Sequence, residues 1–121
     1  MRWHSPTGHF GRQANWQDTS AGVYKIGYPV GIAGGQEIQI ENGPIVLHDG
    51  LIELRHGNPN DREGSSGDAW VAHYSTADSN DHNYAISVSS FYFTNTPEIA
   101  YGPAFGPDFK RLLDYVSSGC Q

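Results

Sequence analysis

The sequence predicts a small all-β domain that is mainly antiparallel, either a β-sandwich or a barrel-like meander of about six strands, with one short C-terminal helix. Apolar side chains alternate with polar or small ones from Tyr24 to Ile32, which is the two-residue period of a strand with one buried face. The 15 glycines and 7 prolines indicate short strands joined by many turns. A chain of 121 residues can bury one modest core, and we therefore expect one domain.

Residues 1–20 have no period, and we expect them to be an N-terminal arm ahead of a single β-rich domain over 21–121. The arm carries the large rings of Trp3, Phe10 and Trp16 among polar residues, and such rings need an apolar surface to cover. That surface is either the domain's own sheet or a neighbouring subunit. In the second case Trp3, Phe10 and Trp16 would form an assembly interface.

Four strands of an antiparallel meander are predicted between residues 22 and 56. The first continues the alternation noted above, with Tyr28 and Val30 on the buried face and Lys25 on the exposed face. Two-residue turn signals separate the later strands. In chain order, the predicted elements are a strand over 22–32, a strand over 36–40, the turn Asn42-Gly43, a strand over 45–48, the turn Asp49-Gly50 and a strand over 51–55.

Two polar loops flank the fifth predicted strand. Residues 57–68 contain no apolar side chain, so we expect a long exposed loop there. Residues 69–75 alternate as a strand, with Trp70 and Tyr74 on one face. Residues 76–83 then form the second polar loop.

The sixth predicted strand, over 84–94, changes phase at Ser89-Ser90. Such a change indicates a bulge, or a strand that leaves one sheet for another. Residues 96–106 show no regular pattern, and a helix over about 107–117 ends the domain. Proline is well tolerated at a helix start, and four apolar residues then form one stripe. The residues that define this helix are Pro107, Phe109, Leu112, Leu113 and Val116.

Charge and composition exclude several functional classes. The formal net charge is −6, and no lysine or arginine lies between Arg62 and Lys110, so we expect neither nucleic-acid nor anionic membrane binding. The N-terminus has no apolar signal segment, so we expect synthesis in the cytoplasm without a signal peptide. The lone Cys120 cannot form an internal disulfide.

Rings and amides around the two polar loops are the candidate ligand-binding residues. Flat rings and planar amides are the groups that bind sugars, so a carbohydrate-binding module is one alternative function. Oxygen ligands at short spacing also suit calcium, so a calcium site at Asp78, Asn80 and Asp81 is an alternative to a solvated loop tip. No other metal or cofactor is expected. The candidate ligand-binding residues are Trp70, Tyr74, Asp78, Asn80, Asp81, Asn83 and Tyr84.

No catalytic residue is assigned from the sequence. There is no Gly-x-Ser-x-Gly motif, and no spacing selects one pair among the histidines and loop carboxylates. We therefore predict a non-enzymatic structural or assembly module that self-associates or joins a larger particle, such as a virion component of a phage capsid or tail. A carbohydrate-binding module is the first alternative. The second is a small hydrolase that uses His73 or His82 with a loop carboxylate.

Overall fold

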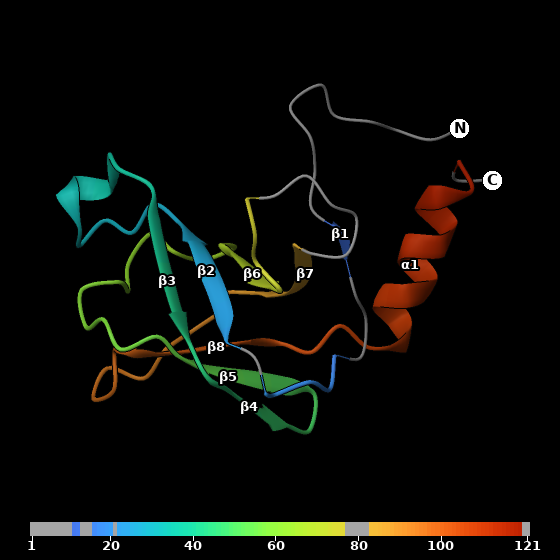
Figure 1. The fold of residues 1–121 in the computed structure, drawn as a ribbon, viewed down its shortest axis with the longest axis horizontal. Helices are drawn as coiled ribbons and strands as arrows, with labels where there is room; N and C mark the ends of the chain where they lie inside the picture. The colour runs from blue at the N-terminus through green and yellow to red at the C-terminus, as the bar shows by residue number, and fades with distance from the viewer. Residues whose placement is uncertain (1–10, 13–15, 21, 77–82, 120–121) are drawn as a thin grey trace.

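Two β-sheets and one C-terminal helix make up the computed structural model, which describes residues 11–12, 16–20, 22–76 and 83–119 (Figure 1). One sheet has five strands in the order β1-β7-β6-β2-β3, and the other has three in the order β4-β5-β8. All pairings are antiparallel except that of β1 with β7. The elements are β1 (Gly11–Arg12), β2 (Val23–Gly27), the 3-10 helix η1 (Ala33–Gly35), β3 (Gln39–Gly43), β4 (Ile45–His48), β5 (Leu51–Arg55), β6 (Ala69–Ala72), β7 (Tyr84–Val88), β8 (Ile99–Pro103) and α1 (Pro107–Ser117).

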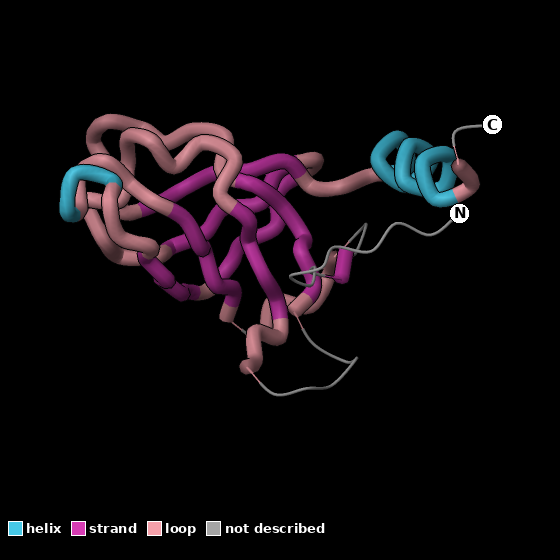
Figure 2. Tube along the Cα trace, turned by 90° about the horizontal axis from the view of Figure 1, so that it is seen from above, coloured by secondary structure: helices cyan, strands magenta, loops and turns pink. Residues whose placement is uncertain are grey.

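The prediction of a mainly antiparallel all-β fold with one C-terminal helix is confirmed. Helix α1 begins at Pro107 as expected, and it lies at one edge of the molecule, beyond the strands (Figure 2). The core lies between the two sheets. Its buried residues are Val23, Ile45, Ile52, Leu54, Trp70, Ala72, Ile86 and Ala100.

The predicted face of the first strand is wrong. Strand β2 ends at Gly27, so Tyr28 and Val30 lie beyond it and are about half exposed, at 53% and 52%. Val23 and Lys25 are the buried residues instead, at 0% and 1% exposed. A lysine can occupy this inner position only because two carboxylates meet its ammonium group, as described below.

The predicted four-strand meander is also wrong, because Asn42-Gly43 is not a turn. Both residues lie in β3 and pair with Tyr24 and Val23 of β2. The chain then passes at Pro44 from the five-stranded sheet into β4 of the other sheet. The second predicted hairpin, at Asp49-Gly50, is confirmed by the antiparallel pairing of β4 with β5.

The change of phase at Ser89-Ser90 does mark a strand that leaves one sheet for another. Strand β7 ends at Val88 in the five-stranded sheet, and Phe91 then bridges to Tyr101 of the three-stranded sheet. Tyr101 belongs to β8, which the sequence did not predict. That strand contains Gly102 and Pro103, both poor strand formers, and is stabilised by its five-residue pairing with β5.

Candidate active site

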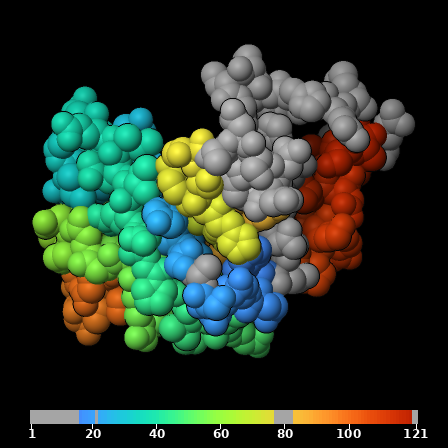
Figure 3. All heavy atoms as spheres, in the orientation of Figure 1, coloured from blue at the N-terminus to red at the C-terminus, as the bar shows by residue number. Residues whose placement is uncertain are grey.

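Three backbone hydrogen bonds tie the polar loop between β5 and β6 to two other parts of the chain, at Val30 and at Ser89. The N–H of Val30 donates to the carbonyl of Glu63 at 2.8 Å, and the N–H of Gly67 donates to the carbonyl of Ser89 at 2.8 Å. The N–H of Ser89 in turn donates to the carbonyl of Asp68 at 3.0 Å. In Figure 3 the light-green segment after β5 lies beside the cyan segment of η1, far from the red helix α1. The predicted long loop is therefore well anchored.

Ser66 is exposed and lies three residues before β6, between two glycines in left-handed conformation. Gly64 has φ 80° and Gly67 has φ 87°. Ser65 is buried and donates its hydroxyl to the carbonyl of Arg62 at 2.6 Å. Within the described residues, no acceptor receives the Ser66 hydroxyl or the backbone N–H groups of Gly64, Ser65 and Ser66. A free hydroxyl beside free N–H groups is the arrangement that a nucleophile and an oxyanion require.

A pocket of about 380 Å³ opens beside Ser66. Its wall is built from the polar loop over residues 57–68 (the Ser66 loop), from the segment that follows β7, and from β8. The lining residues are Asp61, Arg62, Glu63, Gly64, Ser65, Ser66, Ser89, Ser90, Phe91, Tyr92 and Ala100. This volume is within the range of small-molecule sites and is large enough for one amino-acid side chain.

A buried ammonium group joins the two ends of the Ser66 loop. Lys25 Nζ lies 2.5 Å from Asp61 Oδ1 and 3.1 Å from Asp68 Oδ2. Burial alone would raise the pKa of Asp61, but hydrogen bonds from Glu41 and Lys25 and the Lys25 charge lower it below its usual value. The pKa of Asp68 is raised, chiefly by burial. Lys25 thereby fixes Asp61, which precedes Ser66 in the chain, and Asp68, which follows it.

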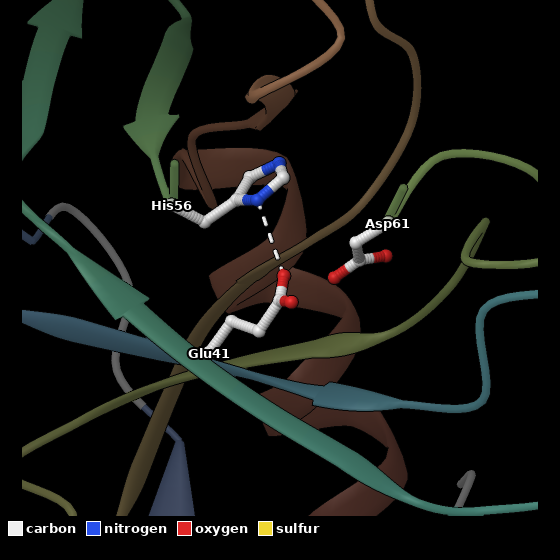
Figure 4. Close-up of side chains that lie close together, drawn as sticks. All are labelled: Glu41, His56 and Asp61. Carbon is white, nitrogen blue, oxygen red and sulfur yellow. Dashed lines mark ion pairs between the residues drawn. The ribbon is translucent and has the colours of Figure 1, made fainter. Parts of the chain in front are cut away.

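Glu41 and His56 extend this buried network (Figure 4). Nδ1 of His56 accepts the N–H of Asn58 at 3.3 Å and lies 3.2 Å from Glu41 Oε2. Burial lowers the pKa of His56, so the ring is neutral at pH 7. Burial and the neighbouring Asp61 raise the pKa of Glu41 to about 7. Because the His56 ring is neutral, this contact is a close approach of two polar groups and not a pair of opposite charges.

Glu41, His56 and Asp61 are also the one group among the described residues with metal-ligand spacing. Their ligand atoms lie within 4.8 Å of one another. The Lys25 ammonium already pairs with Asp61, and below pH 7 a proton on Glu41 neutralises the second carboxylate. The charges of this cluster are thus met by groups of the chain itself.

Two of the predicted ligand-binding rings serve the fold. Trp70 is 0% exposed and donates Nε1–H to Ser89 Oγ at 2.8 Å, so the prediction that its ring binds a ligand is wrong. Tyr74 is half-buried against Tyr24, with ring centroids 4.9 Å apart.

The other predicted ligand residues lie near the far end of β6 from Ser66 or outside the described ranges. The Asn83 amide makes two hydrogen bonds with the backbone of Ser75, at 2.9 and 2.8 Å. The half-buried Tyr84 packs near the core and near His73, with ring centroids 6.1 Å apart. Asp78, Asn80 and Asp81, and the calcium site predicted there, lie outside the described residues.

Of the three predicted interface rings, only Trp16 is described. It packs against the core of its own domain and near the His73 ring, with ring centroids 5.2 Å apart. Its Nε1–H donates to the carbonyl of Asp18 at 2.8 Å. Trp3 and Phe10 lie outside the described ranges.

His73, one of the two bases considered for a hydrolase, is far from Ser66. Its Nε2 lies 3.7 Å from Asp18 Oδ2. The whole of β6 separates it from the Ser66 loop, a rise of roughly 13 Å for four strand residues. His73 therefore cannot activate Ser66, and His82 lies outside the described residues.

Sequence reasoning missed Ser66. The Gly-x-Ser-x-Gly motif belongs to a strand-to-helix turn, whereas residues 64–67 are Gly-Ser-Ser-Gly and precede a strand. The available signal was a serine between two close glycines in a long polar loop. That signal alone does not separate a nucleophile from an ordinary turn.

A substitution at Gly64 tests how tightly the loop is built. An alanine Cβ there would lie 2.6 Å from Val30 Cγ2 and 3.3 Å from Val30 N, at a φ that alanine disfavours. Gly57 has a similar φ of 82° but no atom within 4 Å. We expect Gly57→Ala to cost about 1–2 kcal/mol from its backbone alone, and Gly64→Ala about 1–3 kcal/mol more. Urea unfolding measures both, and equal costs would contradict this packing.

No helix in the described ranges has the length and hydropathy needed to cross a membrane.

The comparisons with known proteins identify the fold. No protein-family model and no curated protein matches the sequence. A solved thermostable serine protease, AL20, from an extremophilic microorganism matches with a TM-score of 0.67 and 22% identity over 93% of this chain and 50% of that one. The protease Anisep from Arthrobacter nicotinovorans matches with a TM-score of 0.71 and 20% identity over 92% of this chain and 49% of that one.

The chain thus spans about half the length of these serine proteases. The likeness contradicts the predicted assembly module or virion component, and it favours the hydrolase alternative over that prediction. The fold of this chain resembles one β-barrel domain of a trypsin-like protease.

Proposed function

We propose that this domain is the nucleophile-bearing half of a serine hydrolase, with Ser66 as the nucleophile. The observation that carries the proposal is the free Ser66 hydroxyl beside free N–H groups and a side-chain-sized pocket. The likeness in fold to half of two serine proteases supports it. A peptide or ester carbonyl is the substrate class that this arrangement suits.

The backbone N–H groups of Gly64 and Ser66 would form the oxyanion hole. In chymotrypsin-type proteases the hole consists of the N–H of the serine and the N–H two residues before it, which correspond here to Ser66 and Gly64. Ser66 Oγ attacks the carbonyl carbon, and the hydroxyl proton passes to a base. The new oxyanion accepts hydrogen bonds from both N–H groups. The leaving group then takes the proton, and water hydrolyses the acyl-enzyme.

The described residues place no base at Ser66. No histidine within the described residues is hydrogen-bonded to Ser66, and chymotrypsin-type proteases place their histidine and aspartate ahead of the serine in the chain. We propose that a second β-domain, in the same or another polypeptide, supplies both. The cleft between the two domains would then hold the substrate.

Labelling with a fluorophosphonate tests this function. The purified chain is treated with the probe, with imidazole added in excess to serve as the base. An oxyanion hole accelerates attack even without a complete triad. We therefore expect Ser66→Ala to reduce the labelling rate on the order of 100-fold.

Ser90→Ala is the matched control, because Ser90 is exposed and lines the same pocket. That variant should label at the wild-type rate. Equal labelling of Ser66→Ala and wild type would contradict the proposed function.

A further inference from the structure

Asp61 is a buried carboxylate in the wall of the pocket beside Ser66. It lines the pocket, and its side chain is 2% exposed. Lys25 approaches it from β2 and is itself 1% exposed. A carboxylate in such a place would ordinarily attract a cationic ligand, because low local dielectric strengthens a charge pair.

The Asp61 carboxylate is not available to a ligand, because groups of the chain already bind it. Lys25 Nζ lies 2.5 Å from Asp61 Oδ1, and Glu41 shares a further hydrogen bond with Asp61. A cation that entered the pocket would have to compete with the Lys25 ammonium, and it would be repelled by that ammonium's charge.

The rest of the wall offers little net charge. Arg62 and Glu63 are exposed and opposite in sign. The other side chains that line the pocket are neutral: Ser65, Ser66, Ser89, Ser90, Phe91, Tyr92 and Ala100. Hydroxyls and rings therefore form the surface that a ligand meets, and these suit an uncharged side chain.

We propose that Lys25 sets the charge preference of this pocket. Because its ammonium group pairs with the Asp61 carboxylate, the pocket accepts an uncharged side chain rather than a cationic one. Lys25 acts through Asp61 and touches no ligand, so it is a positioning residue. The inference rests on the proposed function, because it takes this pocket as the place where a substrate side chain binds.

The test compares two ligands of nearly the same shape, cationic benzamidine and neutral benzamide. Dissociation constants are measured at pH 6, where Glu41 is mainly protonated, by amide NMR titration of the 121-residue chain. In the wild type we expect benzamide to bind at least as tightly as benzamidine. The Lys25→Met/Asp68→Asn variant frees Asp61 and leaves only one uncompensated carboxylate. There we expect the benzamidine preference to rise about tenfold or more.

A matched triple variant, Lys25→Met/Asp61→Asn/Asp68→Asn, should lose that gain, which a general effect on stability would not explain. Three results would overturn the proposal. The folded double variant could keep the wild-type ratio, the wild type could bind benzamidine tenfold more tightly than benzamide, or neither ligand could bind any variant. The wild-type measurement does not depend on whether a variant folds. Phosphonylation of Ser66 is measured separately, so failure of the Lys25 role is distinguishable from failure of the proposed function.

Discussion

Replacing Lys25 with methionine should lower the free energy of unfolding by about 3–5 kcal/mol, because it leaves buried carboxylates without their counter-charge. Lys25 is 1% exposed and lies within 3.1 Å of both Asp61 and Asp68. Methionine fills a similar volume, so the loss would report charge rather than packing. Urea unfolding at pH 7 measures it.

A surface lysine provides the control. Lys110 pairs with Asp114 on α1, but both side chains are more than half exposed, at 59% and 64%. Lys110→Met should therefore change stability by no more than about 0.5 kcal/mol. Neutralising the whole buried group, as in the triple variant above, should recover most of the loss. A cost for Lys25→Met as small as that for Lys110→Met would show that Lys25 is not held in this network.

Replacing Glu41 with glutamine should remove a pH dependence of stability. Burial and Asp61 raise the pKa of Glu41 to about 7 from its ordinary 4.5, so the folded state binds the proton more tightly than the unfolded state does. The stabilisation is fully present below pH 4.5 and is lost as the pH rises to about 7. The whole change is on the order of 3 kcal/mol at most.

Glutamine keeps the shape of the neutral acid and cannot ionise. The stability of Glu41→Gln relative to wild type should therefore increase across this window and stay constant above it. Asp61 does not obscure the effect, because its pKa is lowered and its contribution is lost only as the pH falls below about 4. Glu37→Gln, at an exposed position ahead of β3, is the matched control. Parallel pH profiles for wild type and Glu41→Gln would contradict the assignment of the proton to Glu41.

Local signals in the sequence were sufficient for several elements of the fold. Pro107 and the apolar stripe after it predicted α1, and Asp49-Gly50 predicted the β4–β5 hairpin. The change of phase at Ser89-Ser90 correctly predicted a strand that leaves its sheet. Each of these features depends on residues that lie close together in the sequence.

Features that depend on distant residues could not be predicted in the same way. Lys25 reads as a solvent-facing residue until Asp61 and Asp68, 36 and 43 positions away, are placed beside it. Strand β8 forms because it pairs with β5. Its propensity for strand is low because it contains Gly102 and Pro103, so the local sequence does not predict it.

The candidate site was missed for the same reason. The pocket beside Ser66 is assembled from the Ser66 loop, the segment after β7, and β8. The sequence predicts Trp70 as a ligand residue because an aromatic ring beside a polar loop is typical of a sugar-binding platform, whereas the structure buries this ring.

A boronic acid titration is the measurement that bears most closely on Ser66. A small peptide boronic acid is added to the ¹⁵N-labelled chain, and amide shifts and the ¹¹B resonance are followed together. We predict a tetrahedral boron adduct in which the Gly64 and Ser66 amides shift most, and no adduct with Ser66→Ala. A boron that stays trigonal, or an adduct that survives Ser66→Ala, would contradict the assignment of Ser66 as the nucleophile.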